Sequence, residues 1–421
     1  MVVVGAGLAG LACAEALTRA GFRVTVFEGR DRVGGRVLTI REPFAGGQYA
    51  EAGGELVAAR DTTFRALARR HGLVLERAPH KLAGGLVYRD RRRTPYARFV
   101  TEATRADVER FWASVRALGR GADPRALDAR SALSLIRELR LYDWARFLVE
   151  HDLRRTYGVE AESLSLLFLV QQTRVGRERS GTLRIRGGND RLPLALAAGA
   201  DVRLETPVQY IERRANGVTV TANEDDVVAD WCVVAIPVPL LTSIEFLPSL
   251  PADLASAAVR LRYGHSAKTL LQYERRFWQA RGDSGAILTD LTFDTSWDGT
   301  GGGRGARGII VADTSGRNGL LYGTMGKRSR TLLVADEVDE VYPGSRARLG
   351  ASDTVAWQSE GWSRGSTVAY APAQVMRFQA AVRRPVGRLL FAGEHTDAYA
   401  GTMEGAIRSG LRSARAIAES P

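Results

Sequence analysis

One lysine in an apolar stretch is the residue of this chain with the clearest capacity for chemistry. Lys268 lies half-way along residues 266–273, a mostly apolar segment that predicts a β-strand. Only three of the 59 basic residues of the chain are lysines. A buried ammonium is costly unless it has a partner, and lysine offers a compact, tunable charge that arginine does not. We therefore interpret Lys268 as functional, the alternative being a strand lysine whose side chain extends to solvent.

The N-terminus combines a short apolar strand with a glycine-rich turn. Residues 1–4 are followed by Gly-Ala-Gly-Leu-Ala-Gly at 5–10 and then by a helical stretch. In this pattern the first glycine permits a tight turn, the second admits a pyrophosphate, and the third lets helix and strand pack closely. N–H groups at the helix start then face the phosphates, and the acid that ends the next predicted strand is placed to bind ribose hydroxyls. The dinucleotide-binding residues predicted here are Gly5, Gly7, Leu8, Ala9, Gly10 and Glu28.

A second glycine-containing segment lies near the C-terminus. Residues 388–396 predict a buried strand that ends in Gly393-Glu394, and a final helix begins at Met403. The partial positive charge at the start of that helix can stabilise negative charge on a bound group. For Glu404, in its first turn, a functional role and a role as a helix-cap or surface acid are equally open.

The segment Arg-Asp-Arg-Val-Gly-Gly-Arg at 30–36 directly follows the second predicted strand. It resembles the second glycine motif of the flavin-containing amine oxidase superfamily, which includes monoamine, polyamine and L-amino-acid oxidases. The two segments described above are similar to other motifs of the same superfamily. The resemblance extends over essentially the whole chain and implies FAD as the cofactor. Further FAD-binding residues implied by the resemblance are Gly29, Arg30, Gly34, Gly35, Arg36, Gly53, Gly54, Glu55, Val208, Trp357, Gly393, Glu394, Thr402 and Met403.

The same resemblance implies two catalytic residues, Lys268 and Trp357. The lysine at the corresponding place in the family binds a water beside atom N5 of the flavin, and the tryptophan flanks the flavin. The amine-oxidising branch of the superfamily usually has this lysine, and the branch of phytoene desaturases and protoporphyrinogen oxidase usually lacks it. Lys268 therefore favours amine oxidation over carbon–carbon desaturation, which remains the alternative.

Three positions depart from the monoamine oxidase pattern. Ser366 stands where some of those enzymes have a cysteine that joins the flavin, so the expected FAD is non-covalent. Thr367 and Thr402 stand in place of the two tyrosines of the aromatic cage, which argues against a simple aryl- or alkylamine. Thr367 and Tyr399 are candidate substrate contacts. The candidates for aromatic walls, which the sequence does not place, are Trp362, Tyr370 and Tyr399.

Glu55 follows the Gly-Gly pair at the place where a carboxylate-binding arginine of an amino-acid oxidase would be sought. Two interpretations of this acid remain open. It could hold the ammonium of a substrate beside the flavin. It could equally be a structural acid that pairs with one of the many arginines.

The reaction that fits these residues is hydride removal from the carbon next to an amine nitrogen. The product would be an imine, and dioxygen would be reduced to hydrogen peroxide. The substrate would be a small amine or amino acid, for example a biosynthetic intermediate with a bulky or polar amine. No side-chain acid–base pair is required, in keeping with the absence of a Ser-His-Asp, paired-carboxylate or metal-ligand pattern from the sequence.

The elements that must position these residues alternate between two domains. The expected fold class is α/β, with a Rossmann-like FAD-binding domain interleaved with a mixed-sheet substrate domain and a helical cap. A helix is predicted at 61–71 and a hairpin at 208–220 around Asn216-Gly217. The FAD-binding domain is expected at 1–78, 187–240 and 350–421, and the substrate domain at 79–186 and 241–349, with the cap at about 101–175.

Composition narrows the class of protein. The net charge of +12 comes from scattered arginines, and the one tight run, Arg91–Arg93, is expected in a loop, so no nucleic-acid partner is predicted. No apolar run approaches the length of a membrane span, and no signal peptide is evident, so we expect no membrane association. The two cysteines, Cys13 and Cys232, lie in apolar stretches, which favours a reduced, cytoplasmic protein. A homodimer is compatible with the sequence.

Overall fold

Five short parallel strands form the sheet that contains the N-terminus, in the order β21-β13-β1-β2-β9. The computed structural model describes residues 1–78, 84–176, 183–303 and 305–420. Every residue of the interior strands β1 and β13 and of the edge strand β21 is buried, as in parallel sheets that are covered on both faces. The bounds are β1 Val2–Val4, β2 Thr25–Phe27, β9 Asp201–Arg203, β13 Cys232–Val234 and β21 Leu389–Phe391.

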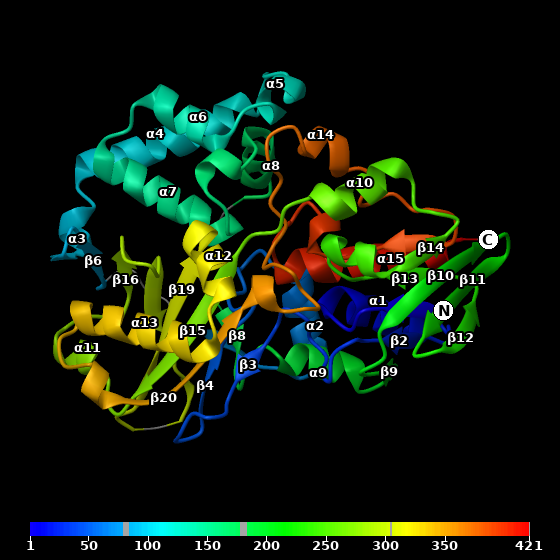
Figure 1. Ribbon diagram of the computed structural model, residues 1–421, viewed down its shortest axis with the longest axis horizontal. Helices are drawn as coiled ribbons and strands as arrows, with labels where there is room; N and C mark the ends of the chain where they lie inside the picture. The colour runs from blue at the N-terminus through cyan, green and yellow to red at the C-terminus, as the bar shows by residue number, and fades with distance from the viewer. Residues whose placement is uncertain (79–83, 177–182, 304, 421) are drawn as a thin grey trace.

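Helices α1 (Leu8–Arg19) and α15 (Met403–Ala418) lie side by side against this sheet (Figure 1). Two glycines permit the close approach. A Cβ atom on Gly410 would lie 2.0 Å from the carbonyl oxygen of Ala9, and one on Gly10 would lie 2.0 Å from that of Gly5. The predicted strand–turn–helix start and the final helix are confirmed, and Gly10 has the packing role expected of the third glycine.

Seven strands form a second sheet, in the order β20-β15-β19-β17-β16-β6-β7, in which only the β16–β6 pairing is parallel. Helices α12 (Gly316–Thr324) and α13 (Lys327–Val341) pack against one face of it. The bounds are β6 Leu86–Arg89, β7 Arg92–Pro95, β15 Ser266–Tyr273, β16 Ile287–Thr289, β17 Thr295–Asp298, β19 Gly308–Ser315 and β20 Leu349–Ala356.

Two expectations are wrong in this sheet. Arg92 and Arg93 were expected in a loop, but they begin β7, because Asp90 and Arg91 take positive φ values and turn the chain back along β6. Residues 350–356 were assigned to the FAD-binding domain, but as part of β20 they pair along β15 and extend the seven-stranded sheet.

A layer of helices stands over the seven-stranded sheet and matches the expected cap at 101–175 (Figure 1). Two of the polar contacts between this layer and the sheet come from α7 (Asp143–Tyr157). The His151 Nε2 atom lies 2.7 Å from the carbonyl oxygen of Thr289, and Arg154 Nε donates to Asp294 at 2.7 Å. The helices of this layer are α4 Glu102–Leu118, α5 Pro124–Asp128, α6 Ala132–Leu139, α7 Asp143–Tyr157 and α8 Leu166–Arg174.

The remaining strands form three smaller sheets. The hairpin predicted around Asn216-Gly217 is present as β10 and β11, in the four-stranded sheet β12-β11-β10-β14. The bounds are β3 Thr39–Ile40, β4 Gln48–Glu51, β5 Leu75–Arg77, β8 Leu183–Ile185, β10 Val208–Arg214, β11 Gly217–Ala222, β12 Asp225–Ala229, β14 Glu245–Leu247 and β18 Gly301–Gly302. The remaining α-helices are α2 Thr62–Arg70, α3 Tyr96–Phe99, α9 Arg191–Ala197, α10 Ala252–Arg260, α11 Phe277–Ala280 and α14 Val375–Phe378.

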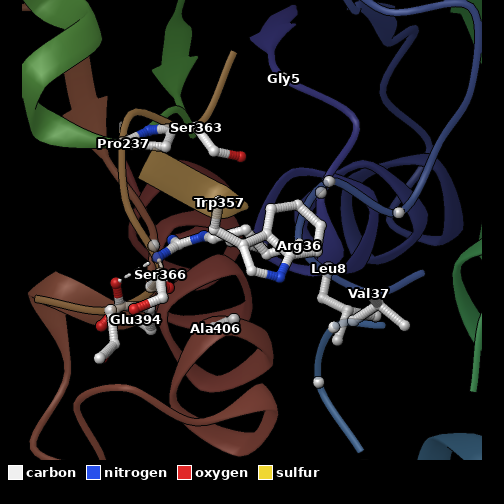
Figure 2. A pocket seen from close by; sticks show the side chains of 18 of the residues that line it. Gly5, Leu8, Arg36, Val37, Pro237, Trp357, Ser363, Ser366, Glu394 and Ala406 are labelled. Carbon is white, nitrogen blue, oxygen red and sulfur yellow. Dashed lines mark hydrogen bonds and ion pairs between the residues drawn. The ribbon is translucent and has the colours of Figure 1, made fainter. Parts of the chain in front are cut away.

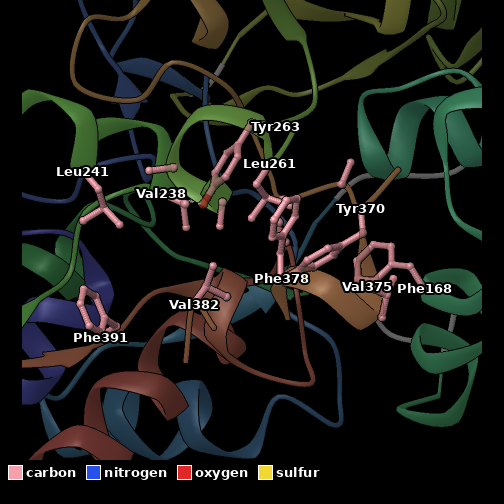
Figure 3. Packing of buried hydrophobic residues seen from close by; sticks show 14 of the residues in the cluster. Phe168, Val238, Leu241, Leu261, Tyr263, Tyr370, Val375, Phe378, Val382 and Phe391 are labelled. Atoms are coloured by element: carbon pink, nitrogen blue, oxygen red, sulfur yellow. Dashed lines mark hydrogen bonds between the residues drawn. The ribbon is translucent and has the colours of Figure 1, made fainter. Parts of the chain in front are cut away.

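One apolar core joins the five-stranded sheet to the helical layer. It includes Val2 and Val4 of β1 together with Phe111 of α4 and Phe168 of α8. Figure 3 shows its middle part, where Tyr263, Tyr370 and Phe378 pack between the two regions. The position of the helical layer is therefore fixed by apolar packing as well as by its polar contacts. In the described part of the chain, no helix is both long and apolar enough to span a membrane.

Candidate active site

A cavity of about 730 Å³ extends from the five-stranded sheet to the seven-stranded sheet. This volume lies within the range of small-molecule and cofactor sites. Residues of β1 and the glycine turn line one part, and Lys268 of β15 and Trp297 of β17 line another. Figure 2 shows Leu8, Arg36 and Trp357 around this space.

The glycine turn forms a backbone cradle in the cavity wall. Gly5 has a φ of +102°, a conformation that favours glycine, and nothing within 4 Å occupies the place of a Cβ on Gly7. Gly7 is the N-cap of α1, and none of the described side chains caps this helix start. The N–H groups of the first turn are therefore available to an anionic group, as phosphate binding requires.

Glu28 lies at the end of β2 and is 5% exposed. One carboxylate oxygen accepts from Ala6 N at 2.8 Å, and the other accepts from Arg30 N at 2.9 Å. These two bonds fix the carboxylate at the edge of the cradle, with lone pairs left for further donors. Its predicted contact with ribose hydroxyls stays a prediction.

Arg36 and Glu394 bring the two glycine segments together. Arg36 Nη1 lies 2.9 Å from Glu394 Oε1 and also donates to the carbonyl oxygen of Ser366 at 2.6 Å (Figure 2). Glu394 accepts two further bonds, from Val368 N at 3.2 Å and Gly401 N at 2.8 Å. The carboxylate thus fixes the loop that carries Ser366 beside the strand end at Gly393.

Three buried polar atoms of the lining have no hydrogen-bond partner among the described residues: Arg60 Nε, Thr367 Oγ1 and His395 Nδ1. Burial lowers the pKa of His395 to about 3, with help from the charges of Arg36 and Arg412, so its ring is neutral. Buried polar atoms are rarely left unpaired in folded proteins. With the open cradle at α1, they fit a polar cofactor in this cavity.

Two glycines near Lys268 allow neighbouring segments to approach the backbone of the cavity wall closely. A Cβ on Gly53 would lie 2.1 Å from the carbonyl oxygen of Arg36, and one on Gly54 would lie 3.0 Å from the sulfur of Met403. Trp357 is buried and donates from Nε1 to the carbonyl oxygen of Ala52 at 2.9 Å, which fixes the plane of its indole ring. The backbone at 52–54 is therefore held between Arg36, α15 and Trp357.

Lys268 is held by a buried acid and two carbonyls. Its Nζ atom lies 2.8 Å from Glu55 Oε2, 3.1 Å from the carbonyl oxygen of Gly53 and 3.3 Å from that of Glu51. The other oxygen of Glu55 accepts from Trp297 Nε1 at 2.9 Å. The side chains of Lys268 and Glu55 are 12% and 6% exposed, so Lys268 does not extend to solvent. Glu55 pairs with a basic residue as one interpretation held, but the partner is Lys268 and not an arginine.

The comparisons with known proteins agree with this geometry. The sequence pattern of the family described as flavin containing amine oxidoreductase matches residues 8–418. The chain belongs to this family. The predicted superfamily is thereby confirmed, and with it an oxidoreductase of amines.

Individual relatives of this flavin amine oxidoreductase cover nearly the whole chain. The putative flavin-containing monoamine oxidase AofH of Mycobacterium tuberculosis is 32% identical, over 99% of this chain and 96% of that protein. The L-amino acid dehydrogenase of Synechocystis sp. is 27% identical, over 99% of this chain and 94% of that protein. The structure of a putrescine oxidase bound to putrescine matches with a TM-score of 0.90 at 26% identity, over 99% of this chain and 98% of that chain.

The cavity of this amine oxidoreductase brings together nearly all residues predicted from the sequence. Gly10 and Tyr399 are the exceptions. Gly10 packs behind the cradle, and Tyr399 lies against the guanidinium of Arg408, so its position gives no support to a substrate contact. The predicted residues that line the cavity are Gly5, Gly7, Leu8, Ala9, Glu28, Gly29, Arg30, Gly34, Gly35, Arg36, Gly53, Gly54, Glu55, Val208, Lys268, Trp357, Thr367, Gly393, Glu394, Thr402 and Met403.

The structure gives the positions of three residues whose role or place the sequence left undecided. Glu404 is 1% exposed and accepts from Thr63 N at 3.1 Å and Phe64 N at 2.8 Å, so it caps α2 and does not face the cavity. Trp362 lines the cavity, but it lies over Gly29 at the end near Glu28, away from Lys268. Tyr370 is buried in the apolar core against Phe168.

Several lining residues near Lys268 were missed from the sequence. Ser266 lies on the same strand and the same face as Lys268. Asp313 is the cross-strand neighbour of Lys268, so only the register between β15 and β19 could have identified it. Arg60 and Arg155 also line the cavity and were not recognised among so many arginines. No group of His, Cys, Asp and Glu in the described ranges could hold a metal ion.

Proposed function

We propose that this protein is an FAD-dependent oxidase that removes a hydride from the carbon next to an amine nitrogen. The product is an imine, and dioxygen is reduced to hydrogen peroxide. The observation that carries the proposal is the continuous cavity between the cradle at Gly5 and the Lys268–Trp357 region. Membership of the flavin amine oxidoreductase family and the putrescine bound to a structural relative support an amine substrate.

FAD fits the cavity as a non-covalent cofactor. The α1 N-terminus would hold its phosphates, and Glu28 would accept bonds from its ribose. Bound FAD supplies the two-electron acceptor for this reaction. A covalent thioether has no support, because Ser366 lines the cavity while Cys13 and Cys232 are buried in α1 and β13, outside the lining.

The residues around Lys268 would keep the reacting amine in a dry, shaped space. The indole rings of Trp297 and Trp357 supply apolar walls, and both are largely buried. Glu55 fixes the ammonium of Lys268 at one place in the wall, so a water bound to it would also have a defined position. The substrate must present a neutral nitrogen at the reacting carbon, for which exclusion of bulk water is favourable.

The first test concerns cofactor and substrate. We expect the purified protein to be yellow, with FAD released intact by acid, and we expect amines to bleach it anaerobically and to yield peroxide in air. Amino acids belong in the same screen, because Arg60 and Arg155 of the lining could bind a carboxylate. Bleaching by an isoprenoid or a tetrapyrrole, with none by nitrogen compounds, would instead support carbon–carbon desaturation.

The second test concerns Lys268. Lys268→Met should slow reoxidation of the reduced protein by dioxygen more than it weakens FAD binding. Lys327→Met is the matched control, because Lys327 pairs with Asp353 at the surface and its side chain is 67% exposed. Equal losses of reoxidation and FAD binding in Lys268→Met would show that the lysine is structural.

A further inference from the structure

Asp313 is a buried carboxylate in the wall of the cavity. It lies on β19 directly opposite Lys268 of β15 and is 5% exposed. Opposite residues of an antiparallel pair have their side chains on the same face of the sheet, about 4.5–5.5 Å apart at Cβ. Asp313 therefore lies in the same wall as Lys268 and lines the same cavity.

The donors to Asp313 are neutral. Ser266 Oγ donates to Oδ1 at 3.0 Å, and Ser315 Oγ donates to Oδ2 at 3.3 Å. Within the described ranges no cation forms an ion pair with this carboxylate. Each oxygen keeps a lone pair for a further donor.

The nearby cations all pair with other acids. Lys268 pairs with Glu55, Arg154 pairs with Asp294 and Glu160, and Arg155 pairs with Asp152. Burial raises the pKa of Asp313, an effect that the charges of Lys268 and Arg155 only reduce. A buried carboxylate without a contacting cation is costly, and a cationic ligand would offset that cost.

Glu55 does not offer the same opportunity. Both of its oxygens are engaged, one by Lys268 and the other by Trp297. An incoming ammonium would have to displace one of these bonds. In this part of the cavity, Asp313 is the acid that can receive an ammonium without breaking an ion pair.

We propose that Asp313 binds a second, protonated nitrogen of the substrate, so that the preferred substrates are diamines or polyamines rather than monoamines. This inference rests on the proposed amine oxidation. One nitrogen stays neutral at the reacting carbon, while the distal ammonium donates to Asp313 beside Ser266. A monoamine of equal chain length fills the same space but leaves the carboxylate without its cation.

Kinetic comparison of matched substrates tests the inference. The holoenzyme is assayed with α,ω-diamines and with n-alkylamines of the same chain length. The wild type should prefer the diamine in kcat/KM by about tenfold or more, and Asp313→Asn should lower this value for diamines by about tenfold to a hundredfold, as expected for loss of a charged partner. The value for monoamines should change little. Asp353→Asn is the control, because Asp353 lies on the neighbouring strand β20 and pairs with Lys327 at the surface.

A binding measurement separates this inference from the proposed reaction. Calorimetry on the dithionite-reduced, anaerobic holoenzyme with butane-1,4-diamine and butan-1-amine measures affinity without turnover. Weaker diamine binding in Asp313→Asn, with the butan-1-amine affinity unchanged, supports Asp313 as the anchor even if no amine is oxidised. Equal effects on both ligands, or no preference in the wild type, would overturn it.

A second variant covers the case in which Asp313→Asn does not fold. Asp313→Glu keeps the charge and moves the carboxylate outward by one methylene group. The optimum diamine should then be one carbon shorter than for the wild type. An unchanged optimum, in a variant with normal FAD content and thermal stability, would contradict the proposed anchor.

Discussion

At the scale of single residues, the pairing of Lys268 with Glu55 is the feature that most affects the chemistry of the cavity. Both side chains are largely buried, and Trp297 fixes the far oxygen of the carboxylate. Removal of one partner from a buried ion pair leaves an uncompensated charge, whereas removal of both does not. The contributions of the two residues to the free energy of unfolding should therefore be coupled.

A double-mutant cycle tests this coupling. Glu55→Ala and Lys268→Met should each lower the free energy of unfolding by about 3 kcal/mol. The double variant should lose less than the sum of the two, with a coupling energy of about 1–3 kcal/mol. Thermal and denaturant unfolding of the flavin-loaded protein measure these values. Additive losses would show that the 2.8 Å contact contributes little.

Glu51 makes stability depend on pH. Burial raises the pKa of its carboxyl to about 8, despite bonds from Asn189 N and Thr39 Oγ1. Because the folded value lies above the unfolded one, the folded state binds the proton more tightly. The stabilisation is complete below the unfolded pKa and is lost as pH rises through about 8.

Glu51→Gln should flatten this dependence. The amide mimics the neutral acid, so the variant should melt several degrees above the wild type near pH 8.5, at about 2 °C per kcal/mol, and should match it near pH 5. Some dependence should remain, because burial also raises the pKa of Asp294 to about 7. Melting curves across this pH range measure the effect, and parallel curves for the two proteins would contradict it.

Residues whose role follows from backbone geometry were predictable from the sequence, whereas residues whose role follows from tertiary neighbours were not. Gly5 and Gly10 follow from the turn that joins a strand to a helix. Glu404 was ambiguous because its partners, the N–H groups of α2, lie 340 and 341 residues away in the chain. Asp313 could not be predicted as a site residue, because its place in the cavity depends on the pairing of β19 with the strand that carries Lys268.

At the scale of elements, α2 begins without a cap from its own N-cap side chain. Asp61 accepts from Ala58 N and does not bond to the first turn of the helix. Glu404 of α15 supplies the missing acceptor, with its two oxygens on Thr63 N and Phe64 N. This arrangement fastens α2 to the helix whose N-terminus lines the cavity.

Loss of this cap should be measurable. Glu404→Ala should lower the free energy of unfolding by about 1–2 kcal/mol, the range for loss of a helix N-cap. Glu419→Ala is the matched control, because Glu419 lies exposed at the far end of α15 and should change stability by less than about 0.5 kcal/mol. Thermal unfolding compares the two, and equal melting temperatures would contradict the capping role.

Helices and strands with a clear periodic pattern of apolar residues were predicted well. Their assignment to domains was predicted less well. The β10–β11 hairpin and the helical cap follow from local turn chemistry and helical spacing. The membership of β20 depends on its pairing with β15 across the chain, which no local pattern reveals. Arg92 and Arg93 were misassigned for the same reason, since strand β7 owes its position to β6.

At the scale of the whole molecule, residues from both ends of the chain build one site. Arg36 and Glu394 are 358 residues apart in sequence, yet they form a 2.9 Å ion pair in the cavity wall. Arg36 also donates to Ser366 O, so the pair fixes a loop as well as a strand end. Cofactor binding and global stability should therefore depend on the same contact.

Comparison of two arginines tests this dependence. Arg36→Met should lower the free energy of unfolding by about 3 kcal/mol and release the flavin during gel filtration, because Glu394 is left buried without its cation. Arg41→Met removes a similar 2.7 Å pair with Asp190, but the Arg41 side chain is 46% exposed, so the loss should stay below about 1 kcal/mol with the flavin retained. Similar melting temperatures and flavin contents for the two variants would show that the Arg36–Glu394 contact does not hold the two halves of the site together. A selective loss in Arg36→Met would show that closure of the site and folding of the chain share this one interaction.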